Sequence, residues 1–408
     1  MKCLILGTYA SSMNIGQMSI IVSTFKEMKK IFPDLKFSLI SQNFDHDSKK
    51  YKKYGINTVK APNSLLSKFF FIFLVIFYRL TKCKLLEKYD IIREIFSADI
   101  AITLSGDIFS DNYGYLSTFS FCYYVMLAKL AKKPVFICAE SIGPFKSFLT
   151  KESAKLIINL SDIISVREKI SMNYLRSLGI KKKIHMTADM AFLLNSLEVE
   201  SKRIEKKVVG INISAIIHKW CFPDILDERK KYKLFVDLFS RFIDYISEKY
   251  NFKILLIPHS YEKNKDDRKI SLEIYKKIKN PKNVRIIKNY KFPEEMKRLI
   301  SSCDLFVATR MHASISATSL YIPTLVLAYS HKFNGIIGDM VGLKKYVIDV
   351  RECYSDDFLD QLKNKFDELL NNKNNIRMLL IKKISRIKKR SSKNIELIYN
   401  FCKKRGIR

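Results

Sequence analysis

One segment of the sequence, residues 304–339, most constrains how this chain folds. A short apolar run at 305–308 is followed by small residues with helical character, and a second apolar run occupies 324–328. Short apolar runs separated by a helix indicate a βαβ unit with two parallel strands. Because parallel strands are joined by crossover helices that cover the sheet, the segment predicts an α/β domain.

Each of these two apolar runs ends in a basic cluster. Arg310, Met311 and His312 follow the first run, and His331 and Lys332 follow the second. Ligands of open α/β sheets bind where the parallel strands end, so both clusters face one site. The segment holds no acidic residue between its two terminal aspartates. We therefore predict an anionic ligand there; the alternatives are a salt-bridged Arg310, a helix-capping His312 and a solvated Lys332.

The rest of the chain repeats the alternation of strands and helices. Apolar runs predict strands at 3–6, 36–40, 100–104, 134–138, 163–166, 208–213, 253–257 and 284–287, with helices at 17–31 and 115–131. A polar stretch at 196–207 is typical of a linker. The pattern predicts an α/β protein with two doubly wound, Rossmann-like domains facing a cleft. Their bounds are 1–196 and 208–355, followed by a basic helical tail at 356–408.

The charge of the chain limits its partners. With 408 residues and a net charge of +33, it favours an acidic ligand or an anionic membrane surface, unless the excess is lysine scattered over solvated faces. No RNP-like sequence, zinc-ligand spacing or basic heptad supports nucleic acid or a metal. Eight cysteines without a CxxC pair, and an N-terminus without signal-peptide features, predict reduced thiols in the cytoplasm.

A continuous apolar run at 69–78 is flanked by lysine and arginine. Ten residues are too few for a spanning helix, which needs about 20. The run is either a buried helix or strand, or an interfacial element that places aromatic side chains in a membrane and cations on its headgroups. The tail at 371–408 carries thirteen Lys and Arg with Glu396 as its sole acid, so it could extend such a surface on the inner face of the membrane.

Several loops that follow predicted strands in the first half contain glycine. Asn14 precedes such a glycine, Gly106 lies in a second loop, and Ser141 and Gly143 lie in a third. Glycine lets the backbone approach a ligand closely, which makes these four positions candidates for substrate binding.

Three further side chains follow predicted strands or loops. Arg167 could hold an anion, or pair with Glu168 or another acid. Asp189 could orient a substrate hydroxyl or cap a helix. His259 stands at a strand end after a proline and is a candidate for proton transfer.

Taken in order, these motifs resemble the polysaccharide pyruvyl transferase family over roughly residues 1–343. The matching elements are Gly7 with Asn14-Ile15-Gly16, Ser105-Gly106-Asp107, Ser141-Ile142-Gly143-Pro144-Phe145, Ser165-Val166-Arg167-Glu168, the stretch 171–179, Asp189-Met190-Ala191-Phe192-Leu193, Arg310-Met311-His312-Ala313 and Tyr329-Ser330-His331-Lys332. The chain departs from the family pattern at three positions. It has Gln17 where an acid is frequent, Ser105 in a glycine-rich loop, and Glu140 where the family has Gln.

The resemblance implies a fold like that of the GT-B glycosyltransferases. It also implies transfer of a pyruvyl group from phosphoenolpyruvate to a sugar of a cell-surface polysaccharide or its lipid-linked precursor, forming a ketal. By motif, Arg310, His312 and Arg167 would hold phosphoenolpyruvate.

As a mechanism, we hypothesise that His312 protonates the methylene carbon while Arg310, Arg167 and Lys332 neutralise the phosphate and carboxylate. Asp189 or His259 would then serve as the base, with neither cofactor nor metal. Two alternatives differ in class. One is a glycosyltransferase that uses a nucleotide sugar on the same fold, against which the acid-free segment argues. The other is a catalytically inactive, membrane-associated binding protein.

Overall fold

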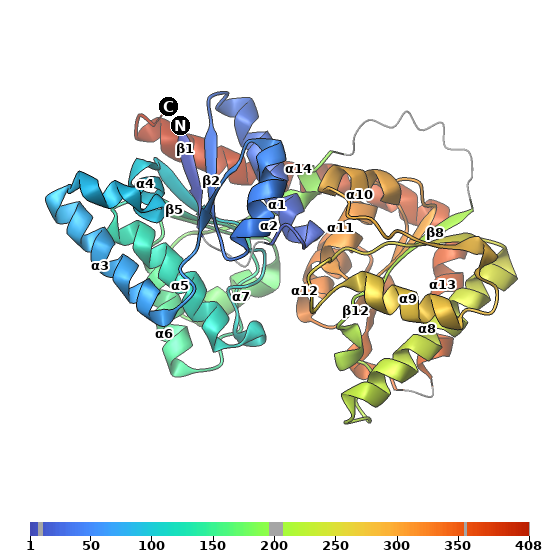
Figure 1. Ribbon diagram of the computed structural model, residues 1–408. Coiled ribbons are helices and arrows are strands. Elements are labelled where there is room, and N and C mark those ends of the chain that lie inside the picture. The colour runs from blue at the N-terminus through green and yellow to red at the C-terminus, as the bar shows by residue number, and fades with distance from the viewer. Residues whose placement is uncertain (7–10, 196–206, 355–356, 408) are drawn as a thin grey trace. The chain divides into compact units, whose positions relative to one another are not determined.

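The computed structural model describes residues 1–6, 11–195, 207–354 and 357–407, which form two compact units, each built on a parallel β-sheet (Figure 1). Unit 1 contains Met1–Ser12, Gln17–Leu193 and Lys389–Arg408, and unit 2 contains Met13–Gly16 and Leu194–Lys388. The prediction of two doubly wound α/β domains with a helical tail is confirmed. The tail is not a separate part, because its long helix begins in unit 2 and ends in unit 1. The predicted linker lies, but for its last residue, outside the described residues.

The sheet of unit 1 has seven strands in the order β3-β2-β1-β4-β5-β6-β7, and every neighbouring pair is parallel. The strands are β1 (Lys2–Ile5), β2 (Lys36–Ser41), β3 (Asn57–Lys60), β4 (Ile100–Thr103), β5 (Val135–Glu140), β6 (Ile163–Val166) and β7 (Ile184–Met186). The order reverses at β1, as it does in other doubly wound sheets.

The sheet of unit 2 has six strands in the order β10-β9-β8-β11-β12-β13, again all parallel. They are β8 (Val208–Asn212), β9 (Lys253–Leu256), β10 (Val284–Ile286), β11 (Leu305–Ala308), β12 (Thr324–Ala328) and β13 (Val347–Asp349). The βαβ unit predicted from residues 304–339 is β11-α11-β12, and its two strands are neighbours in the sheet.

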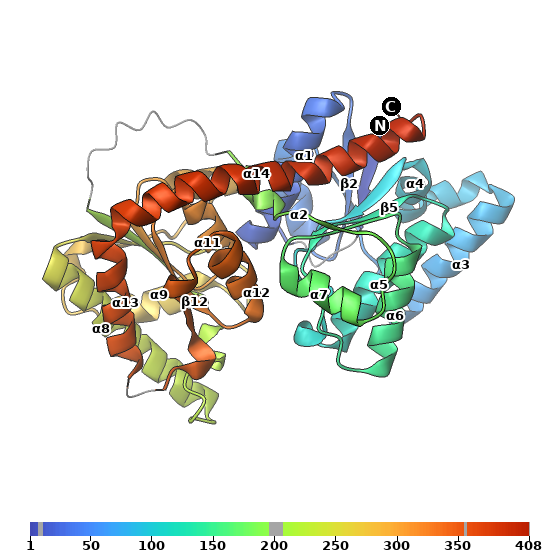
Figure 2. The ribbon, with the colours of Figure 1, turned by 180° about the vertical axis from the view of Figure 1, so that it is seen from behind.

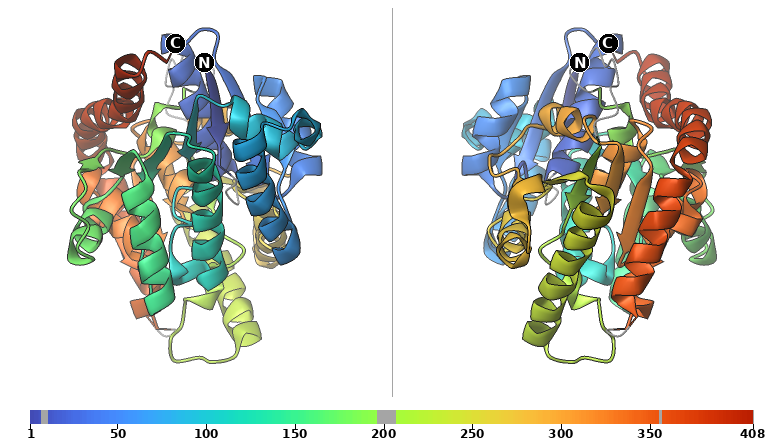
Figure 3. Two further views of the ribbon diagram at one scale, coloured as in Figure 1. Left: turned by 90° about the vertical axis from the view of Figure 1, so that its left-hand side faces the viewer. Right: turned by 90° about the vertical axis from the view of Figure 1, so that its right-hand side faces the viewer.

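Helices alternate with the strands in both units. They are α1 (Ile15–Ile31), α2 (Phe44–Tyr51), α3 (Leu65–Thr81), α4 (Asp90–Ser97), α5 (Tyr115–Leu130), α6 (Phe148–Leu160), α7 (Lys169–Ser177), α8 (Glu228–Tyr250), α9 (Asp267–Lys277), α10 (Pro293–Ile300), α11 (Met311–Thr318), α12 (His331–Phe333), α13 (Phe358–Asn371) and α14 (Lys373–Lys404). In unit 1, α3, α5 and α6 lie side by side on one face of the sheet (Figure 3, left).

The opposite face of the unit 1 sheet is covered by α1 and the end of α14 (Figure 2). Phe25 of α1 packs edge-on against Phe37 of β2, with ring centroids 5.2 Å apart. Phe401 of α14 packs in the same way against Phe136 of β5 at 5.0 Å. The basic tail therefore lies on the face of this sheet opposite to α3.

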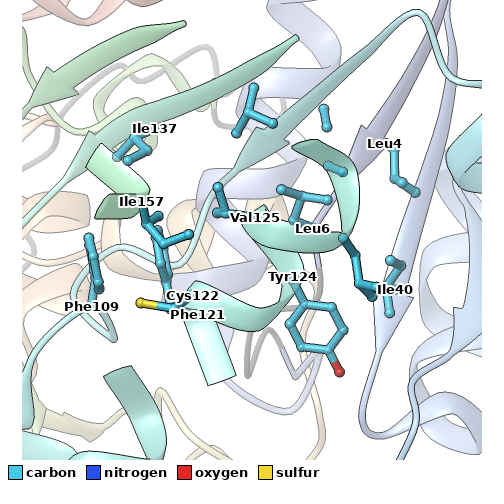
Figure 4. Packing of buried hydrophobic residues seen from close by; sticks show 14 of the residues in the cluster. Leu4, Leu6, Ile40, Phe109, Phe121, Cys122, Tyr124, Val125, Ile137 and Ile157 are labelled. Atoms are coloured by element: carbon cyan, nitrogen blue, oxygen red, sulfur yellow. The ribbon is translucent and has the colours of Figure 1, made fainter. Parts of the chain in front are cut away.

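The main core of unit 1 lies between its sheet and the helices α3 to α7. Figure 4 shows Leu4 of β1, Leu6 just after that strand, Val125 of α5 and Ile157 of α6 within this cluster. All four side chains are almost fully buried. Burial of the apolar side chains of this cluster is the main favourable contribution to the stability of the unit.

The strands that we did not predict, β3, β7 and β13, each lie at the edge of a sheet. Strands in the middle of a parallel sheet are covered on both faces and appear as continuous apolar runs. An edge strand is covered less completely, and the three residues of β7 are all only half-buried. The local sequence of such a strand resembles a loop.

The apolar run at 69–78 forms most of α3, which lies at the surface of unit 1 (Figure 1). Only Leu74 and Val75 of this helix are buried. The interpretation of the run as a buried helix or strand is therefore wrong. In the described part of the chain, no helix is long and apolar enough to cross a membrane.

Candidate functional site

In unit 2, four loops leave the sheet at the edge where its parallel strands end, which we call the carboxyl edge. The central strands β9, β8, β11 and β12 are neighbours, so their following loops also lie next to one another. These loops carry His259 after β9, Arg310 and His312 after β11, and His331 and Lys332 after β12. The fold thus gathers every candidate that we named in this half of the chain.

Arg310 forms an ion pair with Asp267 at this edge. Its Nε donates to both carboxylate oxygens of Asp267 at 3.0 and 2.8 Å, and its Nη2 donates to the same carboxylate at 2.7 Å. Burial disfavours the charged guanidinium, but the carboxylate outweighs it, so the pKa of Arg310 lies above its usual value. The structure therefore shows the salt-bridged Arg310 that we named as an alternative, because Asp267 of α9 lies beside the acid-free segment. The same acid weakens our argument against a nucleotide-sugar donor.

Asp267 also joins three loops of the carboxyl edge. Its fully buried carboxylate accepts hydrogen bonds from the amides of His259 at 2.9 Å, Ser260 at 3.0 Å and Ala215 at 3.0 Å. The side chain of Asn212 adds a further bond, accepting from the amide of Arg310 at 3.1 Å. These hydrogen bonds therefore hold the loops and the Arg310 guanidinium in fixed positions relative to one another.

The segment Met13–Gly16 belongs to this edge, although the rest of the first 193 residues belongs to unit 1. Asn14 forms an antiparallel bridge with Ser260, and the amide of Ile15 donates to the carbonyl of His259 at 3.1 Å. A Cβ on Gly16 would lie 2.5 Å from Nδ1 of His312. Asn14, which we predicted as part of the N-terminal domain, thus belongs to the surroundings of His259 and His312 in unit 2.

His259 is fully buried and neutral. Burial, with the nearby His312 and Arg310, lowers the pKa of His259 to about 3. Neither ring nitrogen has a hydrogen-bond partner among the described residues. Because a buried polar group without a partner is costly, such groups in a native fold are frequently kept for a functional reason.

The loop after β12 packs inward. Lys332 is 1% exposed, so the prediction that it could be a solvated lysine is wrong. Met311, at the first position of α11, is also buried, while His331 is half-buried at the start of α12. Tyr329, just before it, stacks on Trp220 with ring centroids 4.5 Å apart.

In unit 1, Arg167 and Asp189 form a fully buried ion pair. Nη1 of Arg167 donates to the carboxylate, and Nε donates to the hydroxyl of Ser141 at 2.8 Å. The Nη2 atom of Arg167 is buried without a partner among the described residues. Burial opposes the charge, but Asp189 and other acids outweigh it and raise the pKa of Arg167. Glu168 does not take part, since it caps α7 through the amide of Ser171 at 2.9 Å.

Asp189 has both carboxylate oxygens engaged by the protein. One oxygen faces Arg167, and the other accepts from the amide of Ala191 at 2.8 Å. The geometry includes the capping role that we weighed, together with a charged partner that the sequence did not reveal.

Two loop glycines serve packing within unit 1. At Gly106, with φ of +78°, a Cβ would lie 3.4 Å from Nη1 of Arg167, so glycine lets the guanidinium approach the backbone. At Gly143, with φ of +76°, a Cβ would overlap the ring of Tyr174. The close neighbour of Gly143 is therefore a protein side chain, where we expected a ligand.

Glu140 is a second buried carboxyl beside Arg167. Its two oxygens accept from the amide of Ser105 at 2.7 Å and from the hydroxyl of Ser105 at 2.8 Å. Burial raises the pKa of Glu140 to about 7, although the bonds from Ser105 and the charge of Arg167 oppose the rise. Two of the departures from the family pattern, Ser105 and Glu140, are thus partners of one another.

We did not predict a role for Asp267 or Asn212 from the sequence. Asp267 is the first residue of α9, where an acid is expected for the helix alone. Asn212 is the last residue of β8 and lies within the predicted apolar run 208–213, so we gave it no separate role. A polar residue at the end of a buried parallel strand was the signal that could have identified Asn212.

The sequence model of the polysaccharide pyruvyl transferase family matches residues 14–331 of the chain. The amylovoran biosynthesis protein AmsJ of Erwinia amylovora is 23% identical over 285 residues. This match covers 66% of the chain and 66% of AmsJ, slightly less than two thirds of that relative.

Solved structures show a similar fold. The UDP-GlcNAc 2-epimerase of Neisseria meningitidis bound to UDP-GlcNAc has a TM-score of 0.60 and 15% identity, with 98% of this chain and 100% of that chain covered. The enzyme of the same name from Methanocaldococcus jannaschii has a TM-score of 0.56 and 14% identity, with 91% and 93% covered. The HepE protein of Anabaena with UDP-glucose has a TM-score of 0.53 and 10% identity, with 97% and 99% covered. At these identities the likeness concerns the fold, which is GT-B-like.

Proposed function

The chain belongs to the polysaccharide pyruvyl transferase family, and from that premise we propose that it transfers a pyruvyl group from phosphoenolpyruvate to a sugar. The acceptor in this proposal is a cell-surface polysaccharide or its lipid-linked precursor, and the product is a pyruvate ketal. The name of AmsJ, an amylovoran biosynthesis protein, supports a place in the synthesis of such a polysaccharide.

The observation that carries the proposal is the way Asp267 holds Arg310. The carboxylate occupies Nε and Nη2 of the guanidinium, while Nη1 has no hydrogen bond to the described residues. A guanidinium held along one side presents its remaining donors in a fixed direction. This geometry suits a phosphate or carboxylate of phosphoenolpyruvate. Because the Arg310–Asp267 pair is nearly neutral, it would recognise an anionic substrate by the direction of its remaining donors more than by net charge.

In the proposed reaction, His312 is the general acid. It is the second residue of α11, where the free amides and the helix dipole favour a bound anion. A proton from His312 goes to the methylene carbon of phosphoenolpyruvate, which becomes a methyl group. The adjacent carbon then acquires positive charge and accepts a hydroxyl oxygen of the sugar, whose proton passes to the base. The bond to phosphate breaks, and a second hydroxyl closes the ketal and loses its proton.

For the base, His259 is the better of the two candidates. Its neutral ring has two nitrogens without partners among the described residues, and its amide is held by Asp267. Its low pKa makes it a weak base, so it would act as a hydrogen-bond acceptor during attack, before a full proton transfer. Asp189, with both oxygens engaged by Arg167 and the amide of Ala191, instead holds the Arg167 side chain within unit 1.

The test is phosphate release from phosphoenolpyruvate in the presence of a lipid-linked or polysaccharide acceptor. His312→Ala should reduce the rate by about 10²–10⁴-fold, the usual contribution of a positioned acid. Activity near that of the wild type would remove His312 as the acid. The half-buried His185→Ala variant serves as a control, because His185 lies on the edge strand β7 of unit 1 and not at the carboxyl edge of unit 2.

A nucleotide sugar is the second candidate donor. Asp267 supplies an acid at the carboxyl edge, and the similar solved structures include complexes with UDP-GlcNAc and UDP-glucose. Against it, the oxygens of Asp267 are already bonded to Arg310 and to three amides. A thermal-shift comparison separates the two donors: phosphoenolpyruvate should stabilise the protein, whereas stabilisation by UDP-sugars alone would favour the second candidate.

A further inference from the structure

Helix α3 exposes an apolar stripe that no other described element covers. The exposed side chains recur at helical spacing, so they share one side of the helix. They are Leu66 at 83%, Phe69 at 62%, Phe73 at 61%, Phe77 at 40% and Leu80 at 77% exposure. The opposite side of α3 packs on unit 1 through Leu74 and Val75. A surface helix of a soluble protein would carry polar residues along such a stripe.

The neighbouring helices extend the apolar surface. Helices α3, α5 and α6 follow β3, β4 and β5 of one parallel sheet, so all three begin near its carboxyl edge. Leu116 in the first turn of α5 is 79% exposed, and Phe148 and Leu149 at the start of α6 are 75% and 67% exposed. Because the helices lie side by side (Figure 3, left), their exposed starts form one end of a common layer.

Cations surround this surface. Arg79, Lys82, Lys84 and Lys88 stand exposed at or beyond the end of α3. The acid among them, Glu87, accepts a hydrogen bond from Tyr78 at 2.6 Å. At α6, the basic residues Lys146, Lys151 and Lys155 accompany Glu152, which pairs with Lys155. Asp90, the first acid after Glu87 in the sequence, pairs with Arg93.

We propose that unit 1 docks on an anionic lipid bilayer through α3 and the starts of α5 and α6. The stripe would enter the boundary between headgroups and acyl chains, while the surrounding cations contact the acidic headgroups. Helix α3 has 17 residues and is fixed to unit 1 along its buried side, so it lies in the interface and does not cross it. A second copy of this chain is the wrong partner, because each carries a net charge of +33 and the cations would face one another.

Docking in this way brings the carboxyl edge of the unit 1 sheet close to the lipid. If the proposed function holds, a lipid-linked acceptor would be presented near that edge. Vesicle binding needs neither donor nor acceptor, so its failure would leave the proposed transfer reaction untouched.

The experiment measures binding of the full chain to vesicles of phosphatidylcholine alone and with phosphatidylglycerol. We expect binding only to the anionic vesicles, with a loss at high salt. Replacing Phe69, Phe73 and Phe77 together by Ser should weaken binding by at least about 100-fold, since each exposed aromatic loses its apolar transfer energy. Unchanged binding of this triple variant would overturn the proposal.

The charge is tested separately by Arg79→Glu with Lys82→Glu and Lys84→Glu. Each cation near an anionic surface contributes about fivefold, so this variant should also lose about 100-fold or more. The matched control reverses Lys181, Lys183 and Lys393, which are equally exposed but lie away from α3, and should bind nearly as the wild type does. Equal losses in both charge variants would show non-specific attraction and overturn the assigned surface.

Insertion of the stripe into the bilayer is measured by the fluorescence of a tryptophan placed in it. In Phe73→Trp with Trp220→Phe, brominated lipids should quench the fluorescence, whereas unquenched fluorescence in bound protein would overturn insertion. Sedimentation at increasing protein concentration tests whether a second copy of the chain binds the stripe instead of lipid. A dimer that dissociates on replacement of the three phenylalanines would show that the stripe binds a second copy.

Discussion

Replacing Glu140 by Gln should change how the stability of unit 1 depends on pH. The Glu140 carboxyl is fully buried, and its pKa is raised from 4.5 to about 7. Below pH 4.5 it is protonated in both the folded and unfolded chain and costs nothing. As the pH rises from about 4.5 to about 7, the unfolded chain ionises first, so stability is lost, and above pH 7 the loss levels off.

The size of this effect follows from the pKa values. At about 1.4 kcal/mol per pH unit, the full loss is about 3 kcal/mol, of which about 2.5 kcal/mol falls between pH 5 and pH 8. Glu140→Gln cannot ionise, and its amide can still accept from the amide of Ser105 and donate to the Ser105 hydroxyl. The variant should therefore gain about 2.5 kcal/mol over the wild type across this range.

Hydrogen exchange followed by mass spectrometry suits this measurement, since peptides covering β4 and β5 report the opening free energy of unit 1 by itself. The control Glu152→Gln replaces an exposed carboxyl of α6 in the same unit and should leave the pH profile unchanged. Parallel profiles for Glu140→Gln and the wild type from pH 5 to pH 8 would refute the reasoning. The Glu140 carboxyl would then ionise equally well in the folded and unfolded chain.

Two further predictions concern unit 2. Asp267→Asn should destabilise the unit by about 3–5 kcal/mol, because Arg310 stays largely buried without its counter-charge. Urea unfolding followed by tryptophan fluorescence measures this loss of stability. A loss below about 1 kcal/mol would contradict the role of Asp267. Gly16→Ala should lower the turnover number at least about tenfold, since its Cβ would displace His312. The control Gly338→Ala, whose Cβ would make ordinary contacts from 3.6 Å, should keep its activity. Equal rates in the two glycine variants would exclude a tight fit at His312.

Local sequence determined the central strands and the edge at which the candidate residues gather. Strands such as β11 and β12 are buried on both faces, so their apolar runs are visible without knowledge of neighbours. The rule that parallel strands end at one edge then placed Arg310, His312 and His259 together. Three of the four edge strands, β3, β7 and β13, were not predicted, because partial burial removes the apolar run that marks a strand.

Only the tertiary structure decided which charges meet. The partner of Arg310 is Asp267, 43 residues away in sequence, and that of Arg167 is Asp189, 22 residues away; no spacing rule connects either pair. The docking of Asn14 beside Ser260 likewise depends on packing between distant segments. An apolar run at 69–78 specified a helix or strand equally well, and its exposure depends on what covers it. Sequence periodicity records the local backbone and the buried faces, whereas ion pairs and exposed surfaces arise from contacts that form when remote segments come together.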